Sequence, residues 1–378
     1  MSETLKKNRD PMTISGYDAI DCDIHPAVPN MQVLMPYLDD YWRDHLTSRG
    51  TDRITLHLTS YPPNAPLSSR PDWRVKGGLA GQDVDQLRTQ ALDAFGSRFA
   101  ICNPIYAAQV LYNEDMSAVL CSAVNQWFAR EWLDRDPRLR ASIMVPSSQS
   151  PQLTVEEIER CAGDKRFVQV LMLCQNELPL GRRYYWPVYE AAERHGLPIA
   201  IHAGSSYRHA PSNAGFPSFF VEEYAGVSQN FKGQLLNMIA EGVFVKFPNL
   251  KVILAEAGFT WLPNFCWRAD KIWRGVRREV PWVKEAPSEY IKRHVRFTLQ
   301  PIDAPENEPK ILERVIDQMG SDDLLLFSTD YPHWHFEGTD ALPKGFPEHL
   351  KKKVLFDNPL ATYGRIRDAI RAQEKEVA

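Results

Sequence analysis

A carboxylate and an imidazole stand one residue apart in the run Asp21-Cys22-Asp23-Ile24-His25-Pro26. Side chains in a β-strand alternate between two faces, so a strand here is expected to place Asp23 and His25 on the same face. The opposite face is expected to carry Ile20, Cys22 and Ile24 under a layer of helices. Such a pair at the end of a strand suits a divalent metal ion. A solvated Asp-x-His pair in a loop is the alternative, and partners elsewhere in the chain must decide.

Eight short apolar runs alternate with amphipathic stretches along the chain, and they are the elements that would position this chemistry. They cover residues 19–25, 99–103, 141–146, 167–173, 197–202, 251–256, 295–299 and 324–329. Near-continuous apolar runs are typical of parallel strands covered by helices, and their alternation with helical segments indicates βα units. Eight such units predict a (β/α)₈ TIM barrel, in which the active site lies at the C-terminal ends of the strands.

Five ionisable side chains fall at the ends of four of these runs. They are Asp23, His25, His202, Glu256 and Asp330. Any one of them can be a buried structural residue, but on a barrel all five would face the same central cavity. Their joint occurrence predicts a metal site at the mouth of the barrel.

Composition narrows the class of protein. The chain has 378 residues, of which 44% are hydrophobic and 24% charged, with a formal net charge of −4. This composition is typical of a globular protein, and the negative charge argues against a nucleic-acid binder. Six scattered cysteines without a Cys-x-x-Cys pair, and the lack of a signal peptide or membrane span, predict a reduced cytoplasmic protein.

Local signals predict where helices start and stop. The sequence Thr-Val-Glu-Glu at 154–157 matches a capping box, which predicts a helix start at Thr154. Gly96, Gly196 and Gly242 predict the ends of helices over 83–95, 185–195 and 228–241.

Two connections are too long for plain βα loops, namely residues 26–81 and 203–220. Both leave the C-terminal end of a strand, so they are expected to cover the mouth of the barrel. We expect one domain over 1–378, with 354–378 as a closing helix.

Three motifs make the chain resemble the amidohydrolase-related superfamily, in the branch of the aminocarboxymuconate semialdehyde decarboxylase relatives. They are Asp23-Ile24-His25, Ile201-His202-Ala203-Gly204 and Ser328-Thr329-Asp330-Tyr331-Pro332-His333-Trp334, and the resemblance extends through 242–263. It implies one divalent metal, zinc first and manganese second, held by Asp23, His25, His202 and Asp330. It also implies a homodimer that acts on a small molecule.

Glu256 departs from the pattern of this branch, whose decarboxylases place a catalytic histidine at the end of strand six. A glutamate can act as a general base, a protonated acid or a metal ligand, but it cannot supply an imidazolium. We therefore predict a hydrolase that cleaves a C–C or C–N bond of a small carbonyl-containing, aromatic or ring-cleavage-derived acid. Metal-activated water would attack, with Asp330 or Glu256 as base.

Two other functions stay open at this point. One is a metal-dependent non-oxidative decarboxylase of an aromatic or muconate-type acid, and the other is a non-catalytic binding protein. His333 is expected to be a loop residue that touches substrate, and it is a catalytic candidate beside Asp330 and Glu256. His335, Arg208 and His209 are weaker candidates for contact with substrate.

Overall fold

A computed structural model of the chain describes residues 18–52, 54, 68–146, 150–205, 210, 214–305, 308–334, 342–343 and 345–377. Arg208, His209 and His335 lie outside these residues, as does much of each long connection. No helix among the described residues is long and apolar enough to cross a membrane.

Eight parallel strands form one sheet in sequence order, and each pairs with the next. They are β1 Ala19–Ile24, β2 Ser97–Cys102, β3 Leu139–Met144, β4 Phe167–Gln175, β5 Ile199–Ser205, β6 Val252–Ala255, β7 Val295–Thr298 and β8 Leu325–Leu326. Backbone hydrogen bonds from Cys22 N to Phe327 O (2.9 Å) and from Asp330 N to Asp23 O (3.0 Å) join the last strand to the first. The sheet is therefore a nearly closed barrel, as predicted.

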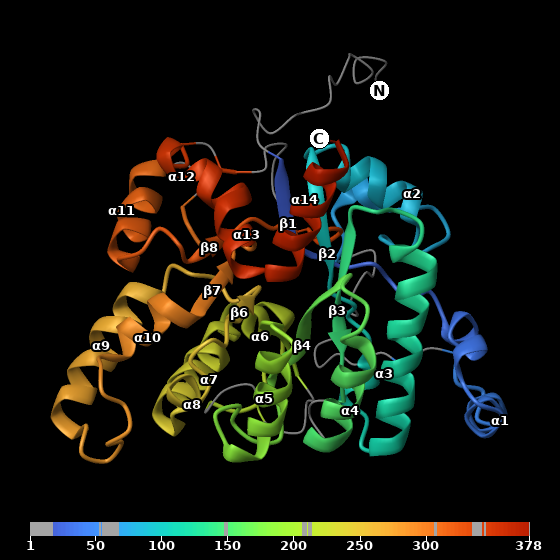
Figure 1. Ribbon diagram of the computed structural model, residues 1–378, viewed down its shortest axis with the longest axis horizontal. Helices are drawn as coiled ribbons and strands as arrows, with labels where there is room; N and C mark the ends of the chain where they lie inside the picture. The colour runs from blue at the N-terminus through green and yellow to red at the C-terminus, as the bar shows by residue number, and fades with distance from the viewer. Residues whose placement is uncertain are drawn as a thin grey trace.

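Helices surround the barrel (Figure 1). They are α1 Asp40–Ser48, α2 Val84–Leu87, α3 Glu114–Phe128, α4 Pro151–Cys161, α5 Trp186–Arg194, α6 Phe220–Gly226, α7 Ser228–Glu241, α8 Val243–Lys246, α9 Leu262–Val276, α10 Pro287–His294, α11 Pro309–Met319, α12 Glu348–Lys352, α13 Asn358–Thr362 and α14 Gly364–Val377. Short 3₁₀ turns at Met31–Val33, Met35–Tyr37 and Pro71–Trp73 lie in the long first connection.

The glycine at the end of α7 predicted the helix boundary correctly, whereas the capping box at Thr154 did not predict the start of α4. Helix α7 ends at Gly242 in the left-handed conformation (φ 84°), as the glycine predicted. The prediction of a capping box at Thr154 is wrong, because α4 starts three residues earlier. Ser150 accepts a hydrogen bond from Leu153 N, and Pro151 takes the first helical position. Thr154 is buried inside the helix.

Two apolar clusters show which way the strands face. The smaller one contains Ile20, Cys22, Phe99, Ile101, Val168, Leu171, Ala200, Ile253, Leu326, Tyr363, Ile366 and Ile370. Residues from six different strands can meet in one small cluster only inside the barrel, so this cluster is the interior. The larger cluster, which includes Ile24, packs the strands against the helices.

The expected alternation along strand one is therefore wrong in part. Ile20 and Cys22 face the interior, whereas Ile24 faces the helices. The pairing of β1 with β2 is irregular between Asp21 and Ile24, and an irregularity of this kind changes which face the following side chains reach. Asp23 and His25 still reach the same cavity.

The C-terminal tail covers the N-terminal end of the barrel. Tyr363, Ile366 and Ile370 enter the interior cluster, and Arg365 of α14 donates to Phe167 O at the start of β4 (2.7 Å). Figure 1 places α14 beside the start of β1. The prediction of one closing helix over 354–378 is wrong, because this stretch is divided into a π-helical turn at Lys353–Asp357, α13 and α14. The single domain and the cover over the barrel mouth stay predictions.

Candidate metal centre

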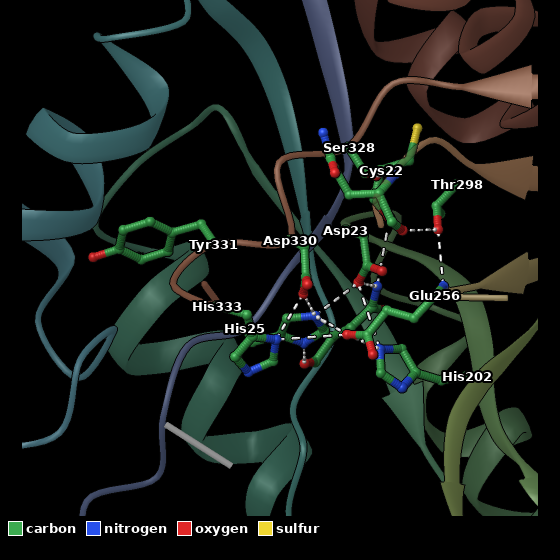
Figure 2. A network of polar contacts seen from close by, with 12 residues as sticks. Cys22, Asp23, His25, His202, Glu256, Thr298, Ser328, Asp330, Tyr331 and His333 are labelled. Carbon is green, nitrogen blue, oxygen red and sulfur yellow. Dashed lines mark hydrogen bonds and ion pairs between the residues drawn. The ribbon is translucent and has the colours of Figure 1, made fainter. Parts of the chain in front are cut away.

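The five predicted side chains come together at the C-terminal ends of the strands. Asp23 and His25 follow from β1, His202 lies in β5, Glu256 follows β6 and Asp330 follows β8. Together with His333 they form two overlapping groups whose ligand atoms lie within 4.8 Å of one another. All six residues are buried. Figure 2 shows that their side chains point toward one another.

His25 is at the middle of the cluster. Its Nε2 lies 3.2 Å from Asp23 Oδ1, 3.2 Å from Glu256 Oε1 and 3.0 Å from Asp330 Oδ1. The other ring nitrogen, Nδ1, lies 2.9 Å from the carbonyl oxygen of Asn103. A proton on Nδ1 that donates to this carbonyl leaves the lone pair of Nε2 directed at the cluster, which is the arrangement of a metal-binding imidazole.

His202 is arranged in the same way on the other side. Its Nδ1 is 2.7 Å from Ala203 O, while its Nε2 is 3.2 Å from Glu256 Oε1 and 3.8 Å from Asp23 Oδ1. Both histidines therefore present Nε2 to the same space, each held by a backbone carbonyl.

His333 completes the group from the loop after β8. Its Nδ1 lies 2.7 Å from Asp330 Oδ1 and 3.5 Å from Glu256 Oε1, and its ring stacks on that of His25 at 4.6 Å. The structure thus places His333 within the cluster, closer to the chemistry than a peripheral loop residue.

Two of the carboxylates depend on an unusual backbone. Glu256 and Asp330 both have φ of 55°, the left-handed region that side chains with a Cβ rarely adopt. Glu256 N donates to Thr298 Oγ1 (3.0 Å), and Asp330 N donates to Asp23 O (3.0 Å). These contacts hold the conformation at the strand ends, where strain is commonly found at functional sites.

Burial and mutual charge shift the pKa values of the group. Burial alone would lower the pKa of His333, but the carboxylates of Asp330 and Glu256 outweigh it and raise that pKa to about 9. Burial and the charge of Glu256 raise the pKa of Asp330, but the charge of His333, with the close contacts of His25 and His333, lowers it to about 2. For Asp23, burial prevails and raises the pKa. Such opposed shifts are typical of functional sites.

The donor atoms fit a divalent metal. Asp23 Oδ2, His202 Nε2 and Glu256 Oε1 are buried and form no hydrogen bond with any residue that the structure describes. Buried polar atoms normally have such partners, so three orphan ligand atoms in one group indicate that an ion fills the space between them. Carboxylate oxygens with imidazoles suit zinc or manganese.

Three residues that support the site were not singled out from the sequence. Asn103 Nδ2 donates to Asp23 Oδ1 (2.7 Å), and Tyr224 OH donates to Glu256 Oε2 (3.1 Å). The hydroxyl oxygen of Thr298 accepts a hydrogen bond from Glu256 N. Asn103 was detectable, because it ends a predicted strand. Tyr224 lies in a helix after β5 and carried no signal.

Asp21 is buried near the cluster but takes no direct part in it. Its carboxylate accepts hydrogen bonds from Thr329 N (3.0 Å), Thr329 Oγ1 (2.7 Å) and Asp23 N (3.2 Å). It therefore joins β1 to the segment after β8, which accounts for a buried carboxylate that the sequence left without a partner. Burial is the main cause that raises its pKa to about 7.

Comparison with known proteins finds one matching family model and several similar proteins. The family model described as amidohydrolase matches residues 20–365. A gamma-resorcylate decarboxylase from Polaromonas sp. is 25% identical over 298 residues, which cover 73% of this chain and 86% of the relative.

Solved structures show the same fold. The crystal structure of a dihydroxybenzoic acid decarboxylase from Polaromonas sp., with bound manganese and the inhibitor 2-nitroresorcinol, has a TM-score of 0.63 and 21% identity, covering 92% of this chain and 96% of that one. A 5-carboxyvanillate decarboxylase from Sphingomonas paucimobilis has a TM-score of 0.65 and 20% identity, covering 92% and 99%.

These relatives contradict the prediction of a hydrolase, since each of them is a decarboxylase. The prediction relied on Glu256, which cannot supply the imidazolium expected at the end of strand six. It gave no proton-donor role to His333, a catalytic candidate whose Nδ1 lies 3.5 Å from that same carboxylate. The loop after β8 therefore brings a third imidazole into the cluster, where the carboxylates of Asp330 and Glu256 raise its pKa.

Proposed function

Because the chain belongs to the amidohydrolase family, we propose that it is a metal-dependent, non-oxidative decarboxylase of a small hydroxylated aromatic carboxylic acid. The observation that carries this proposal is the buried group of three carboxylates and three imidazoles at the barrel mouth. It is supported by the decarboxylases among the relatives, at least one of which holds manganese.

Asp23, His25, His202 and Asp330 are the proposed ligands, with Glu256 as a further oxygen ligand through Oε1. A divalent ion bound there would hold the carboxylate and a neighbouring phenolic oxygen of the substrate and offset their charge. We favour manganese over zinc, because a set with several carboxylates is comparatively hard. The expected homodimer stays a prediction.

The pair formed by Asp330 and His333 is the proposed proton donor. The reaction adds a proton to the ring carbon that carries the carboxylate, and the C–C bond then breaks, leaving its electron pair on the ring and releasing carbon dioxide. No oxidant and no water is consumed. His333 Nδ1 lies 2.7 Å from Asp330 Oδ1, and the carboxylates of Asp330 and Glu256 raise the pKa of its imidazole. This geometry allows the proton to pass through the pair to the ring.

Glu256 has a different role from the base that was first expected. Tyr224 occupies its Oε2, and its Oε1 lies within 3.5 Å of nitrogen atoms of His25, His202 and His333. Its negative charge is therefore placed to balance an ion held by His25 and His202, and it also raises the pKa of His333.

The test is a panel of ortho-hydroxylated benzoates, including 2,6-dihydroxybenzoate, incubated with the manganese-loaded protein. We expect carbon dioxide release, one deuterium at the vacated ring carbon in D₂O, and no uptake of labelled oxygen from H₂¹⁸O. Incorporation of ¹⁸O into an organic product, or a metal-loaded protein that turns over no member of the panel, would contradict the proposal.

A further inference from the structure

A chain of buried polar side chains leads from the candidate metal centre through the barrel interior to the C-terminal tail. Asp23 accepts from Asn103, Asn103 accepts from Gln169, and Gln169 accepts from Tyr363. The donor–acceptor distances are 2.7, 3.0 and 2.9 Å in that order. These residues lie on or next to β1, β2, β4 and α14, so the chain of hydrogen bonds crosses the barrel.

Asn103 contacts both proposed ligands from strand one. Its side-chain Nδ2 donates to Asp23 Oδ1, and its backbone oxygen lies 2.9 Å from His25 Nδ1. Its own backbone N–H donates to Ile24 O at 2.7 Å, which fixes it against β1. The position of Asn103 therefore sets the orientation of a carboxylate and of an imidazole at once.

Two donors on the side away from Asp23 set the orientation of the Asn103 side-chain amide. Its Oδ1 accepts hydrogen bonds from Gln169 Nε2 and from the hydroxyl of Ser142. Turning this amide over would direct its NH₂ at those two donors and its oxygen at the Asp23 carboxylate. Both changes are repulsive, so the two donors keep Nδ2 on Asp23.

Gln169 is held in the same way. Its Nε2 also lies 2.9 Å from Ser142 Oγ, and its Oε1 accepts from the Tyr363 hydroxyl. All four side chains of the network are buried, with at most 1% of the surface exposed in Tyr363, Gln169, Ser142 and Asn103. Water therefore does not compete for these hydrogen bonds, and a buried group that loses its partner pays the full cost of desolvation.

We propose that Gln169 and Tyr363 are positioning residues of the metal centre. They act through Asn103, whose Nδ2 donates to Asp23 Oδ1, the oxygen that lies 3.2 Å from His25 Nε2, and so orients this carboxylate in the cluster. The C-terminal tail thereby contributes to the geometry at the opposite end of the barrel. This inference rests on the metal site of the proposed function but not on the reaction.

The main test measures the Kd of Mn²⁺ for Gln169→Glu by titration of the metal-free full-length protein. The new carboxylate keeps the size of the glutamine and can accept from Tyr363, but it cannot donate to Asn103 Oδ1. The Asn103 amide is then expected to turn over and weaken Mn²⁺ binding by about tenfold, the lower end of the effect of outer-shell substitutions at metal sites.

Gln109→Glu is the matched control. Gln109 is also a buried glutamine of the barrel, but its Nε2 donates to Val145 O and Leu171 O and not to the network. We expect it to lower thermal stability while leaving the Kd of Mn²⁺ unchanged. Equal losses of affinity in both variants would mean that general destabilisation is responsible, and would overturn the inference.

Tyr363→Phe is a milder second variant, which removes one oxygen atom. We expect about threefold weaker Mn²⁺ binding, whereas Tyr189→Phe, which removes a buried hydroxyl bonded to Leu180 O, is expected to bind as wild type. Wild-type affinity in both Gln169→Glu and Tyr363→Phe would refute the inference. Failure of the wild-type protein itself to bind Mn²⁺ would instead refute the metal site and the proposed function.

Discussion

Glu256 and Asp330 share an uncommon backbone conformation, and both carry carboxylates of the candidate metal centre. A left-handed φ at a residue with a side chain costs on the order of 1–3 kcal/mol and persists only where neighbouring contacts enforce it. Here the enforcing contacts come from Thr298 and from the backbone of Asp23. The bend directs side chains from the ends of β6 and β8 to the same point, next to His25.

Asp330→Asn is expected to abolish most of the activity. The amide keeps the shape of the side chain but loses the charge that His25 and His333 contact at 3.0 and 2.7 Å. We expect a loss of at least about 100-fold in kcat and a clear loss of bound manganese, measured by turnover and metal analysis. Glu157→Gln, another buried carboxylate that bonds Asn125 and Arg160, should keep both. A fully active Asp330→Asn protein would contradict the assignment.

Tyr224→Phe is expected to have a smaller effect that is confined to the site. Its hydroxyl is 3.1 Å from Glu256 Oε2, and hydrogen bonds to charged groups contribute about 1.5–3 kcal/mol. Loss of this bond lets the carboxylate rotate, so kcat should fall about tenfold with little change in Tm. Tyr331→Phe removes a hydroxyl that bonds Gln90 instead, and should leave kcat nearly unchanged. Equal rates for both variants would show that Tyr224 does not hold Glu256.

The elements of the barrel were largely predictable, because burial on both faces makes parallel strands apolar. The run at 167–173 became β4, Phe167–Gln175, and the run at 295–299 became β7, Val295–Thr298. The capping signal at Thr154 failed because Ser150 and Pro151 compete as a helix start, and such short patterns are common by chance. The faces of β1 were wrong because no sequence pattern marks the irregular pairing with β2.

The candidate site was predictable to the extent that its residues end strands. Asp23, His25, His202, Glu256 and Asp330 were found in this way, and the structure brings all five together. Tyr224, Gln169 and Tyr363 could not be found, since a tyrosine or glutamine in an apolar stretch acquires its role only from strand register and helix placement. His333 was a candidate because it follows Asp330 closely, but no sequence pattern predicts the course of its loop, which a β-bridge joins to Ser69.

That bridge leads to a prediction at the scale of elements. The segment 68–73 pairs with the loop after β8 through Arg70 N to Pro332 O (2.9 Å) and Trp334 N to Ser68 O (3.2 Å). Trp73 is buried and packs on Tyr331 with 4.9 Å between ring centres. The end of the first long connection therefore holds the loop that carries His333.

Trp73→Ala is expected to loosen this loop. Replacing a buried tryptophan with alanine lowers the free energy of unfolding by about 3–5 kcal/mol. Here the lost packing is the contact between segment 68–73 and the loop after β8. We expect faster amide hydrogen exchange at Tyr331, His333, Trp334 and Arg70, with exchange in β4 little changed, together with lower activity. Trp132→Ala removes a buried tryptophan near α3 and should not selectively affect residues 331–334. Unchanged exchange there in Trp73→Ala would contradict the role of the segment.

At the scale of the whole molecule, ion pairs remote from the site govern part of the acid stability. Asp136 lies before β3 and accepts from Arg88 Nε (2.8 Å) and Arg138 Nη2 (2.9 Å). Burial opposes its ionisation, but these two arginines prevail and lower its pKa to about 2. The pairs link the helical turn at Arg88–Leu92 to the start of β3.

Asp136→Asn should therefore destabilise the protein in a pH-dependent way. A carboxyl group with a lowered folded-state pKa stabilises the fold fully above its unfolded value of 3.8, and this contribution is lost as the pH falls toward 2. At pH 7 we expect a loss on the order of 1 kcal/mol, since water reaches part of the network. Urea unfolding from pH 7 to pH 2 should show the difference from wild type shrinking below about pH 4. A constant difference across this range would contradict the assignment.

Metal removal provides the last prediction for the molecule as a whole. The proposed ligands lie in or directly after β1, β5, β6 and β8, which are distant in sequence. Only the folded protein brings them together, so the ion is expected to bind the folded state and not the unfolded chain. Free Mn²⁺ at 1,000 times its Kd stabilises the fold by about 4 kcal/mol, which corresponds to a rise in Tm of several degrees for a chain of this size. Thermal unfolding in EDTA and after restoring Mn²⁺ should show this shift in the wild-type protein, and Asp330→Asn should show little of it. Equal Tm values for the wild-type protein with and without Mn²⁺ would mean that the buried cluster does not hold this metal.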